Sequence, residues 1–232
     1  MCNHIFIVTS IYSNEGLTQK TAEKADVRHL GRLSLARTFS LTVVLAGLAV
    51  IAGWIFQIGV LTSISPSWVS MKFTTAIAFV LSGITLYLLT KARTGEFDLV
   101  QVALSMISFT LALLMGLFIF SAFLRVHTGL EDLFVIDPGS PTCVVPGRPS
   151  MLTMLNFILI AVAGMLAVFN TVKLSRKLRA IGIIVGSIGL IAIIGYISGT
   201  PVLFYYIAGF NTAMALHTAA LFVLLGIGLA CI

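Results

Sequence analysis

The feature that most constrains this chain is the placement of its charges, because long stretches contain none. After Arg179 no Asp, Glu, Lys or Arg occurs through Ile232, a run of 53 residues. Four earlier uncharged windows of 34, 18, 26 and 24 residues cover residues 38–71, 73–90, 99–124 and 149–172. A helix needs about 20 apolar residues to cross a hydrocarbon core about 30 Å thick. The windows therefore predict an integral membrane protein.

Composition supports this class and excludes others. Of the 232 residues, 59% are hydrophobic and 9% are charged, whereas about 25% are charged in ordinary soluble domains. So few charges could not cover the core of a soluble globule. The same values exclude a disordered chain and a coiled coil. The cysteines Cys2, Cys143 and Cys231 are scattered, so we expect neither an intrachain disulfide nor a metal site, and we expect no cofactor.

The windows predict an all-α bundle of six transmembrane helices. The first four windows each hold one span, and the last holds two, separated by the helix-breaking sequence Ser198-Gly199-Thr200-Pro201. Only helices are expected, because every backbone polar group must be paired within lipid. The predicted spans lie near residues 39–62, 73–90, 99–124, 151–172, 180–198 and 212–231.

Basic residues predict the orientation of the bundle. Eleven of the 14 Lys and Arg residues would lie on one side, and cytoplasmic loops are enriched in these residues. Both termini are therefore expected in the cytoplasm of a multi-pass inner-membrane protein. Residues 1–37 would form a basic cytoplasmic segment, and residues 38–232 the transmembrane domain. The positive charge then favours anionic lipid rather than nucleic acid.

A short pattern recurs in the second helix of each predicted hairpin: a Thr, an aromatic residue four positions later, and a small residue four after that. Such positions lie along one helix face. The pattern predicts three tandem hairpins in parallel orientation, although chance similarity among apolar helices stays an alternative. Parallel repeats also differ from the twofold repeats common in transporters. The matching residues are Thr75, Phe79 and Gly83; Thr153, Phe157 and Ala161; and Thr218, Phe222 and Gly226.

The predicted spans contain no charged side chain. Proton relays, ion-coupled pumps and voltage sensors depend on such groups, so these functions are disfavoured. The segment Gly195-Tyr196-Ile197-Ser198-Gly199 differs by one residue from the nucleophile motif of rhomboid-type proteases, and nothing places a base beside Ser198. We therefore expect a protein that is not an enzyme.

His217 is the most notable polar residue within a span. A buried imidazole needs a hydrogen-bond partner and can change charge near neutral pH. It is either a structural histidine bonded across helices or part of a site that registers a ligand, lipid or proton near the outer face. The loop of residues 125–150 is either a cap over that site or a connector. The candidate ligand-binding residues are His217, Met214 and Thr218, with Asn211, Arg148 and His127 as weaker members.

Two segments carry a resemblance to a known class of protein. The last predicted hairpin, with Gly195-Tyr196-Ile197-Ser198-Gly199 and Asn211-Thr212-Ala213-Met214-Ala215-Leu216-His217-Thr218-Ala219, resembles membrane-embedded sensor regions of bacterial and archaeal signalling proteins. Arg148-Pro149-Ser150 followed by Thr153-Met154-Leu155-Asn156-Phe157 resembles the entry to an earlier helix of these regions. In that family the sensor precedes PAS, histidine-kinase or diguanylate-cyclase domains.

The resemblance implies a sensory input module of a two-component-like system. Its partners would be the lipid bilayer, a cytoplasmic output domain or partner signalling protein, and a second copy in a homodimer. Any kinase or cyclase activity would lie in an output domain outside this chain. The alternatives are a small-solute transporter or channel, and a structural subunit of a membrane complex.

Overall fold

The computed structural model describes residues 30–63, 65, 68–92, 98–124, 129, 146–169, 171–206 and 212–232. Within these ranges all regular secondary structure is helical, as predicted. The helices are the first helix (Leu30–Ile55), α2 (Gly59–Thr62), α3 (Phe73–Ala92), α4 (Asp98–Leu124), α5 (Met151–Val168), α6 (Leu174–Ser198), the short 3-10 helix η1 (Pro201–Phe204) and α7 (Leu216–Cys231).

Five of these helices are long and apolar enough to cross a membrane: the first helix, α3, α4, α5 and α6. With 16 residues, α7 is apolar but shorter. On α4 a row of large side chains is exposed, from Leu99 (86%) through Phe109 (59%) to Phe123 (78%). Contact between these apolar side chains and lipid is not unfavourable in free energy, whereas their exposure to water would be. The described helices therefore indicate a multi-pass membrane protein.

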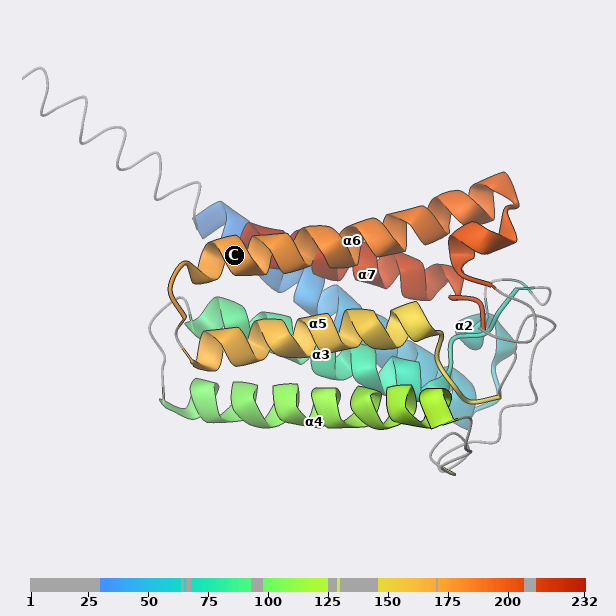
Figure 1. Ribbon diagram of the computed structural model, residues 1–232, viewed down its shortest axis with the longest axis horizontal. Coiled ribbons are helices and arrows are strands. Elements are labelled where there is room, and N and C mark those ends of the chain that lie inside the picture. The colour runs from blue at the N-terminus through green and yellow to red at the C-terminus, as the bar shows by residue number, and fades with distance from the viewer. Residues whose placement is uncertain are drawn as a thin grey trace, which may run out of the picture.

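Figure 1 shows the long helices side by side, with successive long helices running in opposite directions. Helix α6 packs along α7, α4 packs along α5, and α3 contacts α4, α5 and α7. Glycines allow the closest approaches, since a Cβ at Gly83 of α3 would lie 2.6 Å from Val44 Cγ2 of the first helix. At Gly182 of α6, a Cβ would lie 2.5 Å from the Gly226 carbonyl oxygen of α7. Small residues serve this purpose in membrane helices generally.

The centre of the core is a triangle of phenylalanine rings. Phe79 of α3, Phe157 of α5 and Phe222 of α7 are each 0% exposed. Their ring centroids lie 4.8 Å (Phe79–Phe157), 4.8 Å (Phe79–Phe222) and 5.0 Å (Phe157–Phe222) apart. The tilted and edge-on orientations are those that aromatic pairs prefer. The aromatic positions of the sequence repeat thus meet in one layer.

The first helix differs from its predicted limits of 39–62. It is already formed at Leu30 and ends at Ile55, because Gln57 is left-handed (φ 56°) and a separate short helix follows. Its early turns belong to the packed bundle, since Ala36 is 0% exposed and Arg37 Nε donates to Thr90 Oγ1 at 3.2 Å. The helix therefore includes residues 30–37, although the distribution of charges had predicted that they belong to the basic segment of residues 1–37.

The fourth and fifth predicted spans also shift at their shared end. Helix α5 ends at Val168 rather than at residue 172, and α6 begins at Leu174 rather than at residue 180. In the first turns of α6, Leu178 is fully buried while Arg176 and Arg179 are exposed. A helix with its charges on one face can extend beyond the apolar core, so the nearest charge does not mark its end.

Candidate functional site: a cavity at three helix starts

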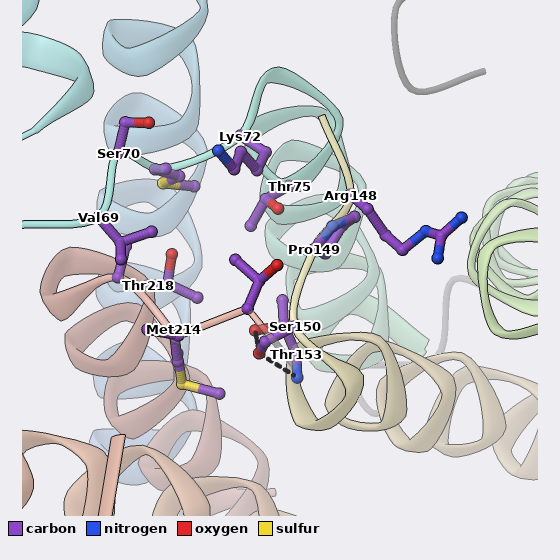
Figure 2. Close-up of a pocket in the computed structure, with 14 residues that line it drawn as sticks. Val69, Ser70, Lys72, Thr75, Arg148, Pro149, Ser150, Thr153, Met214 and Thr218 are labelled. Carbon is purple, nitrogen blue, oxygen red and sulfur yellow. Dashed lines mark hydrogen bonds between the residues drawn. The ribbon is translucent and has the colours of Figure 1, made fainter. Parts of the chain in front are cut away.

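A small cavity lies where α3, α5 and α7 begin. Figure 2 shows its lining, which the described residues supply from three segments only: 69–75, 148–153 and 212–218. Its volume is about 10 Å³, roughly what one water molecule requires. The described lining residues are Val69, Ser70, Met71, Lys72, Thr75, Arg148, Pro149, Ser150, Thr153, Thr212, Ala213, Met214, Ala215 and Thr218.

The α3 wall is formed by the residues that lead into that helix. The Met71 carbonyl accepts a hydrogen bond from Trp54 Nε1 at 2.8 Å, and the Met71 N–H donates to the Thr62 carbonyl at 2.8 Å. These bonds hold the entry to α3 against the end of the first helix and α2. Lys72 follows and is only 3% exposed, and Thr75 lies in the first turn of α3.

The α5 wall begins with a helix cap. The Ser150 hydroxyl accepts a hydrogen bond from the Thr153 N–H at 3.3 Å, and the two side-chain oxygens lie 2.7 Å apart. Capping by serine satisfies a backbone donor at the helix start. Arg148 lines the cavity with its stem, but its guanidinium points away in Figure 2 and donates from Nη2 to Ser121 Oγ of α4 at 2.9 Å.

The α7 wall is held from both sides at Met214. Its N–H donates to the Phe204 carbonyl at 3.0 Å, and its carbonyl accepts from the Tyr196 hydroxyl at 2.8 Å. Helix α7 starts without a side-chain cap, because its N-cap residue is Ala215. Thr218 lies in the first turn and is 2% exposed.

The threonines of the sequence repeat meet at this cavity. Thr75, Thr153 and Thr218 each line it from a different helix (Figure 2). Each lies four residues, about one turn, before one phenylalanine of the triangle. Thr153 is bonded to Ser150. Among the described residues, no hydrogen bond engages the hydroxyl of Thr75 or Thr218. The cavity therefore has two hydroxyl groups available to an occupant.

Three of the six predicted site residues come together here: Met214, Thr218 and Arg148 line the cavity. His217 is not among the described lining residues, and its Nε2 is buried without a hydrogen-bond partner in the described part of the chain. Whether it binds a ligand stays a prediction. Asn211 and His127 lie outside the described residues.

Sequence reasoning left eleven of the fourteen described lining residues out of the predicted site, among them Met71, Lys72, Thr75 and Thr153. The repeat contained the missing signal. Met71 and Thr75 have the same four-residue spacing as Met214 and Thr218, so equivalent helix starts should present them to one place. Lys72 had been considered only as a charge that sets orientation.

The described lining offers hydroxyl groups, the cationic side chain of Lys72 and thioether sulfurs. Hydroxyls and cations bind by donating hydrogen bonds and by charge, while methionine sulfur adapts its contacts to irregular shapes. Such a set suits the binding of a small polar or anionic species.

Comparison with known proteins found no matching family model, no matching curated protein and no matching solved structure. The proposals below therefore depend on the cavity and on the helices around it.

Proposed function

We propose that this chain is a non-catalytic sensory input module whose ligand site is the cavity at the starts of α3, α5 and α7. In this proposal six helices cross the membrane as three tandem hairpins with the same orientation. Helix α7 rises about 24 Å by itself, and the buried residues 212–215 that precede it complete the crossing. The converging Thr and Phe positions support the threefold repeat.

The positions of the basic residues support an outward-facing cavity. Arg32, Arg37 and Lys91, together with the exposed residues Arg176 and Arg179, lie at the end of the bundle opposite the cavity. Basic residues are enriched on the cytoplasmic side of membrane proteins. The cavity would then face the exterior, and both ends of the domain would face an output domain or partner in the cytoplasm.

Helix α7 provides a physical connection between the two ends. It begins at the cavity with Thr218, and near its other end the Ala230 carbonyl accepts a hydrogen bond from Arg32 Nη2 at 3.0 Å. Along the way its backbone touches α6, since a Cβ at Gly226 would lie 2.6 Å from Gly186 Cα. An interface without interlocking side chains at this point permits the shifts of about 1–2 Å that helices make in signalling.

One observation carries the proposal: the first turns of α3, α5 and α7 form one cavity at equivalent positions of the sequence repeat, and α7 connects this cavity to the opposite end of the bundle. The test joins residues 1–232 to a histidine-kinase core and measures kinase autophosphorylation in membrane vesicles at matched protein levels. We expect Thr218→Val to change the basal signal by about threefold or more, a free-energy difference of about 0.7 kcal/mol.

Thr110→Val is the matched control, because Thr110 lies exposed on α4 and bonds only within its helix, to the Met106 carbonyl at 2.9 Å. The control should leave the signal unchanged. If Thr218→Val and Thr153→Val both left the signal at the level of the unsubstituted fusion, the proposal would be wrong. Solute flux in proteoliposomes would favour the transporter or channel instead.

A further inference from the structure

We infer that the cavity binds a small monovalent anion of about the size of chloride. This inference rests on the proposed function, because it names the ligand class of the same site. It draws on three features of the cavity: the helix ends that meet there, the hydrogen-bond donors they carry, and the charge and size of the space.

The first feature is the direction of the helices. Lys72 directly precedes α3, Ser150 caps α5, and Ala215 caps α7, and all three residues line the cavity. The start of a helix carries roughly half a positive charge and attracts anions. The opposite, negative ends of α4 and α6 contribute none of the described lining residues. Three positive helix ends therefore act together on one small volume.

The second feature is the supply of donors. The hydroxyls of Thr75 and Thr218 line the cavity, belong to residues that are each 2% exposed, and engage no described partner. At α7 no side chain caps the first backbone N–H groups. At α5 the Thr153 N–H donates to Ser150 Oγ, so the Ser150 hydroxyl can donate to Thr153 Oγ1. When the bond runs in that direction, the Thr153 hydroxyl proton is left to donate to an occupant of the cavity.

The third feature is charge and size. Lys72, 3% exposed, lines the cavity, and the described lining includes no Asp or Glu. The volume of about 10 Å³ is close to that of a single small occupant, which favours a monatomic anion over sulfate, phosphate or an organic acid. Water fits by size, but an anion also gains from the partial positive charge of three helix starts.

The experiment uses the full chain, purified in detergent and kept at constant ionic strength by exchanging gluconate for chloride. Binding to the folded state should raise the melting temperature saturably, by about 5 °C when chloride exceeds its Kd about 100-fold. Bromide should act like chloride, whereas phosphate should not. Crystals grown in bromide should show an anomalous peak between Thr75, Thr153 and Thr218.

Two variants test the assignment. Thr218→Val and Thr75→Val should each raise the chloride concentration at half-maximal stabilisation by about tenfold or more, while Thr110→Val should leave it unchanged. A melting temperature independent of chloride, with no bromide peak in the cavity, would show that water alone occupies it.

The two proposals can fail separately. If Thr218→Val changes kinase output but the unsubstituted chain ignores chloride, the sensory role stands and the anion assignment is wrong. If chloride binds but no cavity variant changes output, the anion site stands and the sensory role is wrong.

Discussion

The phenylalanine triangle makes a quantitative prediction about stability. Each ring contacts both others, with centroids 4.8–5.0 Å apart. Replacing one ring by leucine removes two of the three aromatic pairs but keeps an apolar side chain of similar bulk. At about 0.5–1.5 kcal/mol per pair, Phe157→Leu should lower the free energy of unfolding by about 1–3 kcal/mol. Because the arrangement is threefold, Phe79→Leu and Phe222→Leu should cost the same within about 1 kcal/mol.

Unfolding of the purified protein by SDS, followed by circular dichroism in mixed micelles, measures these differences. Phe109→Leu is the matched control, because Phe109 is 59% exposed on α4 and should cost little. The double variant Phe79→Leu/Phe157→Leu should cost less than the sum of its single variants by one pair, about 0.5–1.5 kcal/mol. Costs no larger than that of Phe109→Leu, or strict additivity, would refute the idea that the three rings stabilise one another.

Three further predictions concern packing, the candidate histidine and orientation. Gly226→Ala should lower the free energy of unfolding by about 1–3 kcal/mol, because the added Cβ would lie 2.6 Å from the backbone of α6. Gly116→Ala is the control and should have little effect, because a Cβ there would meet nothing within 4 Å. Equal effects of the two variants in SDS unfolding would contradict this prediction. His217→Ala should change the output of the kinase fusion without lowering the amount of folded protein, and if both were unchanged, His217 would not belong to the site. A membrane-impermeant maleimide should label Pro146→Cys from outside intact cells and Lys177→Cys only after lysis, with all native cysteines replaced by serine; the reverse pattern would place the cavity in the cytoplasm.

The helix limits show where sequence reasoning was sufficient and where it was not. Apolar windows located every long helix, because lipid-facing and buried positions are both apolar and charge is excluded from either. The windows misplaced the start of the first helix and of α6, because both continue past basic residues. Arg37 reaches Thr90, and Arg176 is exposed beside buried turns. Charged residues mark where a helix leaves the hydrocarbon core of the membrane, but they do not mark where the helix ends.

The candidate site shows the same division at the level of single residues. The spacing of the repeat was enough to indicate that Thr75, Thr153 and Thr218 are equivalent, since residues four apart share a helix face whatever the neighbours are. It could not show that these faces meet, which depends on how three helices pack through their glycines and aromatic rings. It also gave His217 the same weight as Thr218; adjacent residues on a helix point about 100° apart, and His217 is not among the described lining residues, so its role stays a prediction. Local periodicity thus determines which residues share one face of a helix. Only the packing of helices that are distant in the sequence determines which of these residues line the same cavity.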